Sequence, residues 1–163
     1  TTILLRGMRE HCLPCERITQ IQNGTNPYFV AEFETGYIVI GDYQFFQGYT
    51  VFLCKEHKTE LHELEPNFRI QFLKEMSLVA EAVYRAFKPQ KLNYECLGNT
   101  DPHLHWHIFP RYEGDPRPQG SVWVIDKAIR QAKKTRPTPE ELEKLKGQLL
   151  EKLKQVAEDS ICQ

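Results

Sequence analysis

The chain has 163 residues, which is enough for one domain with a substantial hydrophobic core. Hydrophobic residues make up 40% of it and charged residues 26%, as in globular proteins, and no apolar run is long enough to cross a membrane. The net charge of -1 excludes a broad basic surface for a nucleic acid polymer but allows a local anion site.

The N-terminal segment, residues 1–7, becomes polar too soon to be a secretory signal. The chain contains five cysteines, and this odd number fits thiols and a metal in a reducing compartment better than a disulfide framework. We therefore expect a cytoplasmic protein.

Three β-like runs come next, at residues 28–33, 36–43 and 46–54, and the short turns between them predict antiparallel strands in a meander. Glu65-Pro66-Asn67 then opens a helix to about residue 87. Its apolar residues recur at three- and four-residue steps: Phe68, Phe72, Met76, Val79, Val83 and Phe87. Residues 92–97 and 103–109 are predicted as two more strands, joined by a turn at 98–102.

The composition changes after Arg111. Residues 113–120 form a linker rich in proline and glycine, and a helix is expected near 126–133. A last helix begins at Thr138, because Thr138 is a good N-cap, Pro139 suits the first helical position and Glu141 completes a capping box. Its narrow apolar stripe needs a partner in this domain or in a second subunit: Leu142, Leu145, Leu149, Leu153 and Val156.

The strand predicted at residues 103–109 contains three of the six histidines of the chain. Because side chains alternate along a strand, His103, His105 and His107 would share one face, while apolar residues occupy the other. Imidazoles gathered in this way indicate a metal site or catalysis. Neighbouring histidines on one face would lie about 7 Å apart, from roughly 3.3 Å of rise per residue, so binding one zinc ion with all three would strain the strand. A division of labour is easier, with one histidine on a metal and two for the substrate.

A set of metal ligands is available. Cys12-Leu13-Pro14-Cys15 has the spacing of a zinc clamp, although such a pair also occurs in redox sites and as unmetallated thiols. His57 and His103 would complete a closed structural site with two cysteines and two histidines. His11 and His62 compete for the histidine positions. Cys54 and Cys96 are expected to be small buried hydrophobic residues, and Cys162 has no expected role.

His105 and His107 remain for chemistry. A neutral imidazole attacks phosphorus well when a backbone carbonyl holds the proton of its far nitrogen. A second imidazole can donate a hydrogen bond to a phosphoryl oxygen. The pair would therefore carry out phosphoryl transfer in two steps through a phospho-histidine adduct.

With these residues in view, the chain resembles the histidine-triad (HIT) family of nucleotide hydrolases and transferases. The family signature His-φ-His-φ-His-φ-φ, where φ is apolar, is matched by residues 103–109. The resemblance covers roughly residues 12–111, including Asp42, the segment 48–57 and Pro110-Arg111. The chain is most similar to the zinc-bearing bacterial members.

The resemblance implies an α+β fold, in which a long helix packs on a five-stranded antiparallel sheet and a C-terminal helical extension is added. Residues 1–112 would form the HIT-like catalytic domain, and residues 113–163 the linker and helical extension of the same domain. It also implies a homodimer with a continuous sheet, and zinc as a structural cofactor on Cys12, Cys15, His57 and His103.

The resemblance further assigns roles in the active site. His105 would attack an α-phosphate and form a nucleotidyl-histidine, the backbone carbonyl of His103 would orient its ring, and His107 would bind the phosphoryl group. For the nucleotide, Asp42 would accept hydrogen bonds from ribose hydroxyls, Ile40 and Tyr43 would line the base pocket, and Asn99 would lie near the phosphates.

Two positions depart from the family pattern. Many members have a further histidine where this chain has Tyr49, which can still donate a hydrogen bond. The turn at 98–102 is short, and Asp101 would repel a phosphate unless it is turned away. Both departures, Tyr49 and the short turn, resemble the pattern of the nucleotidyltransferase branch of the family.

The function expected first is cleavage of a dinucleoside polyphosphate, such as diadenosine tetraphosphate, or of a nucleoside phosphoramidate at the α-phosphate. The alternatives are a nucleotidyltransferase or phosphorylase that uses the same histidine, or a nucleotide-binding protein with little activity. The expected partners are a nucleotide and a second subunit, not a nucleic acid polymer or a membrane.

Overall fold

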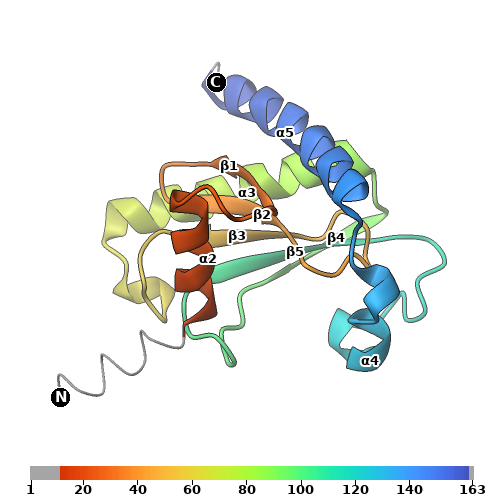
Figure 1. The fold of residues 1–163 in the computed structure, drawn as a ribbon. Helices are drawn as coiled ribbons and strands as arrows, with labels where there is room; N and C mark the ends of the chain where they lie inside the picture. Colours follow the sequence, from red (N-terminus) through yellow and green to blue (C-terminus); the bar gives the residue numbers. More distant parts are fainter. Residues whose placement is uncertain (1–11, 162–163) are drawn as a thin grey trace.

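The computed structural model describes residues 12–161 and contains a five-stranded antiparallel sheet with helices on both faces (Figure 1). The strand order is β1-β2-β3-β5-β4. The strands are β1 (Phe29–Glu32), β2 (Gly36–Ile40), β3 (Thr50–Cys54), β4 (Lys91–Glu95) and β5 (His105–Arg111). The α+β fold class with five antiparallel strands is confirmed.

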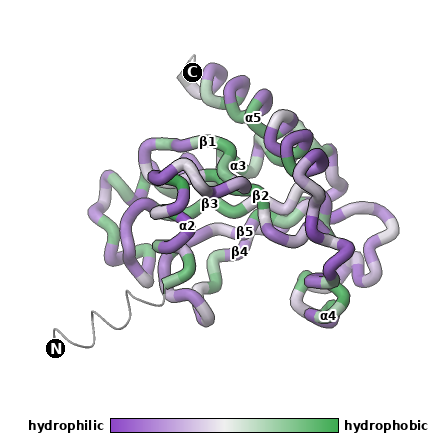
Figure 2. The backbone as a smooth tube through the Cα atoms, viewed as in Figure 1, coloured by the Kyte–Doolittle hydropathy of each residue, from purple (hydrophilic) through white to green (hydrophobic). Residues whose placement is uncertain are grey.

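One face of the sheet is covered by two long helices, α3 (Pro66–Phe87) and α5 (Pro139–Ile161) (Figure 1). The apolar stripe of α5 has its partner within this chain, because α5 packs on α3 and β1. Figure 2 shows hydrophobic positions alternating with hydrophilic ones along α5. Strand and helix residues share one core: Ile38, Phe52, Phe72, Val79, Val83, Ile108, Leu149 and Leu153, each at most 2% exposed.

The other face of the sheet carries two smaller covers. The helix α2 (Leu13–Gln22) packs through Ile18 onto Tyr37, Val39 and Leu53. At the far end, the 3-10 helix η2 (Val122–Val124) buries Val122 against a cluster of aromatic residues, and α4 (Lys127–Arg130) follows it. The sheet therefore lies open between α2 and α4.

Several predicted boundaries were wrong. The strand predicted at 36–43 ends at Ile40, and the one predicted at 46–54 begins only at Thr50, because residues 41–49 form a tight connection. In that connection the side-chain amide of Gln44 donates to the carbonyl oxygens of Gly41 and Tyr49, and its oxygen accepts from the Gly48 backbone. The strand predicted at 92–97 spans Lys91–Glu95.

The helix expected near 126–133 is shorter than predicted. α4 ends at Arg130, and the 3-10 helix η3 (Lys133–Thr135) follows. Asp126 caps α4, since its carboxylate accepts from the Ala128 backbone, and Ala132 is extended and ends the helical turn. Another 3-10 helix, η1 (Leu61–Glu63), precedes α3. Across residues 12–161, none of the helices has both the length and the apolar character that a membrane span requires.

Candidate active site and metal centre

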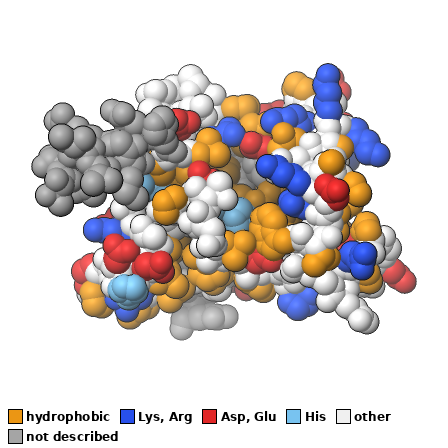
Figure 3. Space-filling view, turned by 90° about the horizontal axis from the view of Figure 1, so that it is seen from below, with side chains coloured by type: hydrophobic (Ala, Val, Ile, Leu, Met, Phe, Trp, Pro, Cys, Tyr) orange, Lys and Arg blue, Asp and Glu red, His pale blue; other side chains and the backbone are white. Residues whose placement is uncertain are grey.

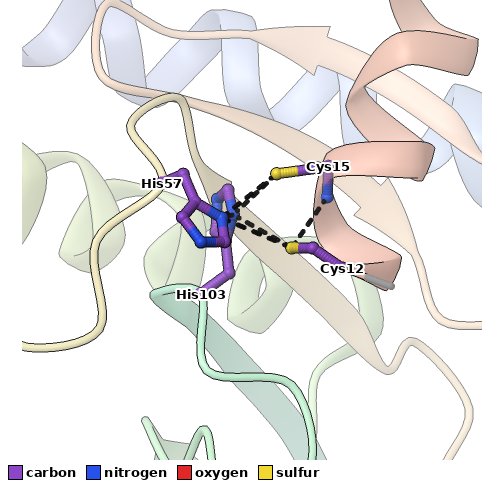
Figure 4. A group of neighbouring side chains, drawn as sticks. All are labelled: Cys12, Cys15, His57 and His103. Atoms are coloured by element: carbon purple, nitrogen blue, oxygen red, sulfur yellow. Dashed lines mark hydrogen bonds between the residues drawn. The ribbon is translucent and has the colours of Figure 1, made fainter. Parts of the chain in front are cut away.

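The two cysteines of the predicted clamp lie at the start of α2. Cys12 is the N-cap, and its sulfur accepts a hydrogen bond from the backbone N–H of Cys15 at 3.4 Å. Both sulfurs point to the same place because one helical turn separates them (Figure 4). The N-terminal end of α2 also favours negative charge, which suits a pair of thiolates.

Two histidines from distant loops face these sulfurs (Figure 4). His57 follows β3 and His103 precedes β5. The Nδ1 atoms of the two rings lie 3.1 Å apart, and their distances to the two sulfurs are 3.2 Å to 3.6 Å. The strand prediction for His103 was therefore wrong, since β5 begins at His105 and the His103 ring is directed to the cysteines.

The four donor atoms fit a tetrahedral zinc ion. With Zn–S of about 2.3 Å and Zn–N of about 2.0–2.1 Å, neighbouring sulfur and nitrogen ligands lie about 3.5 Å apart and two nitrogens about 3.3 Å apart. The Nε2–H of His103 donates to the Cys54 carbonyl at 2.7 Å, so its Nδ1 lone pair is the one left for a metal. Of the two competing histidines, His62 lies in η1 outside this group, and His11 lies outside the described residues, as does Cys162.

The two remaining cysteines have no place in this group. Cys54 and Cys96 are free thiols, and Cys54 is fully buried as predicted whereas Cys96 is half-buried. Burial raises the pKa of Cys54 to about 11, so its thiol stays protonated at neutral pH.

The other two histidines of the signature lie on β5 with both rings facing the open part of the sheet. His105 Nδ1 lies 2.6 Å from the carbonyl oxygen of His103, and only an N–H can donate to that oxygen. His105 Nε2 therefore carries a lone pair, and it lies 3.1 Å from Nε2 of His107. The apolar residues that alternate with them face the α3 side of the sheet, where Leu104 and Ile108 are buried and Trp106 is partly buried.

Tyr49 fixes the proton on His107. Its hydroxyl lies 2.5 Å from His107 Nδ1. Burial, with smaller contributions from Asp42 and Glu95, raises the pKa of Tyr49 well above its usual range, so the hydroxyl stays protonated and donates a hydrogen bond to the imidazole. Nδ1 of His107 is then the acceptor, and Nε2–H is the donor.

Burial also lowers the pKa of His107 to about 3, with the neighbouring His105 contributing less. His107 is therefore neutral across the physiological range. The resulting chain runs from the Tyr49 hydroxyl through His107 and His105 to the His103 carbonyl, with every donor matched to an acceptor. It presents a nucleophilic nitrogen next to an N–H donor, which is an arrangement for attack on an electrophile that carries oxygen.

A glycine makes room for this tyrosine. A Cβ atom on Gly41 would come within 2.0 Å of the Tyr49 ring. The ring also stacks on Phe109, with centroids 4.1 Å apart and planes 4° from parallel. Residue 41 must therefore lack a side chain for Tyr49 to reach His107.

The two histidines form one wall of a cleft of about 260 Å³ between α2 and α4. All four predicted nucleotide-binding residues line it: Ile40, Asp42, Tyr43 and Tyr49. Apolar residues of the sheet, such as Val39, Val51 and Leu53, form its floor. Figure 3 shows histidine atoms near the middle of the view from below, with hydrophobic and basic side chains close by.

The predicted Asn99 is exposed in the turn before β5 and is not among the residues that line this cleft. Asp101 lines it instead, and its carbonyl oxygen accepts from the His103 backbone. The structure therefore does not bring Asn99 together with the histidines, and it keeps an acidic residue at that side of the cleft.

Two polar residues, Arg17 and Gln131, are among the cleft residues that were not predicted. Arg17 of α2 donates to Asp42 Oδ2 at 2.7 Å, which leaves Oδ1 of that carboxylate for a ligand. Gln131, directly after α4, lines the opposite side. The signal that could have found Arg17 is the cysteine pair. If a helix is predicted to start at that pair, Arg17 lies two residues after Cys15 on the same helix.

The comparisons with known proteins agree with this arrangement. The family model described as HIT domain matches residues 25–114, which is more than half of the chain. No curated protein matches the chain significantly.

Similar folds are found among solved structures. A histidine triad protein from Marinobacter aquaeolei is 24% identical with a TM-score of 0.67, covering 78% of this chain and 89% of its own. A hypothetical histidine triad nucleotide-binding protein from Sulfolobus tokodaii is 23% identical with a TM-score of 0.67, covering 87% and 93%. A Zn-bound histidine triad family protein from Mycobacterium smegmatis is 20% identical with a TM-score of 0.64, covering 93% and 99%. The signature, the fold and the family model together place this chain in the HIT family.

Proposed function

We propose that this protein is a nucleotide phosphohydrolase that cleaves a dinucleoside polyphosphate or a nucleoside phosphoramidate at the α-phosphate. The observation that carries the proposal is the His105 ring. Its Nδ1–H is held by the His103 carbonyl at 2.6 Å, and its Nε2 lone pair faces the cleft beside His107. This is the state in which an imidazole is a nucleophile.

The reaction would proceed in two steps. His105 Nε2 attacks the α-phosphorus, and an N–P bond forms as the bond from phosphorus to the leaving group breaks. The leaving group departs with that electron pair. Water then attacks the same phosphorus, the N–P bond breaks, and the nucleoside monophosphate is released with the imidazole restored.

His107 would act on the phosphoryl oxygens. In the structure its Nε2–H donates to His105, and a phosphoryl group placed between the rings would replace His105 as the acceptor. A donor that is already oriented costs little reorganisation as negative charge develops on the oxygens. Tyr49 supports this by holding the tautomer of His107.

The nucleoside would occupy the α2 side of the cleft. Asp42 has Oδ1 available for the ribose hydroxyls, while Arg17 holds Oδ2. Ile40 and Tyr43 would contact the base, and Asn99 would have to move to reach the phosphates from its exposed turn.

The same proposal includes a structural zinc ion on Cys12, Cys15, His57 and His103. The interatomic distances given above and the Zn-bound relative from Mycobacterium smegmatis support it. Four protein ligands leave no position for water, so zinc would supply cross-linking of the α2 start to the loops before β5 and after β3.

The proposal also includes a homodimer, since β4 is an edge strand and, among the described residues, no strand pairs with its outer edge. Sedimentation of the purified protein tests it, because a monomer at micromolar concentration would contradict a stable dimer.

The decisive experiment traps the adduct. The protein is mixed with diadenosine tetraphosphate labelled at the α-phosphate and quenched in alkali, in which a phosphoramidate bond survives. We expect a labelled adenylyl group that is released by acid and is absent in His105→Asn. A wild-type protein that turns over the substrate without labelled intermediate would contradict the mechanism, and one that binds the nucleotide without turnover would identify a binding protein. Adding inorganic phosphate or another acceptor separates hydrolysis from nucleotidyl transfer.

A further inference from the structure

The segment that contains η2 and α4 is fixed beside the histidines. Val122 and Ile125 are buried against Phe46 and Phe109, and Phe109 is the strand neighbour that lies two residues after His107. The backbone around residue 125 therefore has a defined position at the end of the cleft opposite α2. The burial of Val122 and Ile125 therefore fixes the backbone from which the neighbouring side chains extend.

Arg130 is the last residue of α4 in this segment. Its guanidinium carbon lies 4.9 Å from the centre of the Trp123 ring, and its Nε donates to the Ile125 carbonyl at 2.8 Å. Trp123 is held in turn, because its Nε1–H donates to Glu95 at 2.7 Å and its ring lies 6.0 Å from the His107 ring. The guanidinium carbon is therefore within about 11 Å of the His107 ring centre. Neither terminal nitrogen of Arg130 has a hydrogen-bond partner among residues 12–161.

The cleft itself lacks a cation for phosphates. The charged residues that line it are Arg17, Asp42 and Asp101, and Arg17 is paired with Asp42 at 2.7 Å. A polyphosphate entering this cleft would meet one unpaired carboxylate, from Asp101. Arg130, within about 11 Å of the His107 ring, has free donors, and its planar fork matches phosphate oxygens.

We propose that Arg130, held by Trp123 and the Ile125 carbonyl, binds the phosphates of the leaving group and makes the site select substrates whose leaving group is anionic. This inference rests on the proposed function. When the His105–phosphorus bond forms, the departing polyphosphate keeps the electron pair of the broken P–O bond, and the proposal places its added negative charge within reach of Arg130. An amine that leaves from a phosphoramidate gains nothing from this cation.

The test compares Arg130→Gln with wild type on two substrates, diadenosine tetraphosphate and an adenosine phosphoramidate. We expect kcat/KM for the polyphosphate to fall about 10- to 100-fold, as for a lost charged hydrogen bond, and that for the phosphoramidate to change less than about twofold. Arg130→Lys should recover part of the loss, because it keeps the charge without the fork. Lys134→Gln is the matched control, since it removes an exposed charge from the same segment.

Equal losses on both substrates would overturn the inference, because they would indicate a structural role for Arg130. No loss on the polyphosphate, or the same loss in Lys134→Gln, would also overturn it. If the wild type hydrolyses neither substrate, the proposed function fails. The role of Arg130 in phosphate binding is then tested by calorimetry, which compares the affinities of wild type and Arg130→Gln for AMP and for a non-hydrolysable ATP analogue. The wild type should then bind the ATP analogue more tightly than AMP and Arg130→Gln should lose that preference; a wild type without the preference contradicts the inference.

Discussion

Replacing Tyr49 with phenylalanine isolates the hydrogen bond that sets the tautomer of His107. The phenyl ring can keep the stack on Phe109, whose centroid lies 4.1 Å away, so the packing of the cleft wall is retained. Only the hydroxyl that lies 2.5 Å from His107 Nδ1 is removed. The substitution therefore tests the hydrogen bond separately from the shape of the site.

The magnitude follows from the burial of this hydrogen bond. A net hydrogen bond contributes about 0.5–1.5 kcal/mol, and a buried acceptor left without a donor costs about 1–3 kcal/mol. We therefore expect the free energy of unfolding of Tyr49→Phe to decrease by about 1–3 kcal/mol. Because His107 no longer favours the tautomer with hydrogen on Nε2, kcat should fall about tenfold, equivalent to roughly 1.4 kcal/mol, while KM changes less than about threefold.

The assay is steady-state release of AMP from a dinucleoside polyphosphate, together with denaturant unfolding of the same preparations. Tyr112→Phe is the matched control, since its hydroxyl donates to the Gln47 carbonyl outside the cleft and its loss should leave kcat unchanged. A Tyr49→Phe protein with the kcat of the wild type would refute the reasoning. It would show that the tautomer of His107 is set by the substrate and not by the protein.

Three further predictions concern the metal cluster, pH and a glycine. Metal analysis of the wild type should find about one zinc per chain; Cys12→Ser should lose this zinc and unfold at lower denaturant, whereas Cys96→Ser should retain the metal. The pKa of His107 is lowered by burial to about 3, so between about pH 6.5 and about pH 3 the unfolded chain binds a proton at this residue that the folded chain does not. The free energy of unfolding should therefore decrease as the pH falls through this range. Urea titrations at about pH 7 and about pH 4.5 should show a smaller decrease for His107→Asn than for the wild type. An equal decrease in both proteins would contradict this prediction. Gly41→Ala should lower kcat at least as much as Tyr49→Phe in the AMP-release assay, because its Cβ would displace the Tyr49 ring; full activity would disprove this close approach.

The sheet and the long helix were predictable because their signals are local. The alternation of histidines with apolar residues on β5 and the three- and four-residue steps of α3 are both read from short stretches of sequence. The errors are at the ends of the predicted strands. His103 has apolar residues on both sides, as His105 and His107 do, but β5 pairs with β3 only from His105 onward, where Leu53 is the paired residue. The cluster with Cys12 and Cys15 determines where the His103 ring goes, and those residues are distant in sequence.

The helix α2 was not predicted, for a related reason. Its buried residues are Pro14 and Ile18, one on each turn, so it lacks the broad apolar stripe by which a helix is recognised. The cysteine pair fixes its start, through the Cys12 cap and the contacts with two histidines. Missing this helix also meant missing Arg17, and with it the ion pair that leaves Asp42 only one free carboxylate oxygen.

The linker after β5 shows the opposite case, a segment predicted correctly as irregular whose position is nevertheless fixed. Arg111 is buried and its guanidinium donates to four acceptors: the side chains of Asp115 and Asn93 and the carbonyl oxygens of Gly120 and Arg117. Such a convergence cannot be read from spacing, because Asn93 comes from β4 and the others from the linker. The same arginine is the last residue of β5, two residues after the histidine signature, so β5 also anchors the segment that carries Arg130.

The cysteine–histidine cluster and the two histidines of the cleft are connected through a single residue, His103. The ring of His103 faces the two cysteines, and its carbonyl oxygen holds the proton of His105 at 2.6 Å. A second connection runs through α2, whose start carries the cysteines and whose next turn carries the Arg17 that pairs with Asp42. We therefore expect any change that releases the start of α2 to disturb both the proposed nucleophile His105 and the carboxylate proposed for the ribose. For this reason we expect the loss of the cluster to lower kcat and raise KM together, although no atom of the cluster lines the cleft.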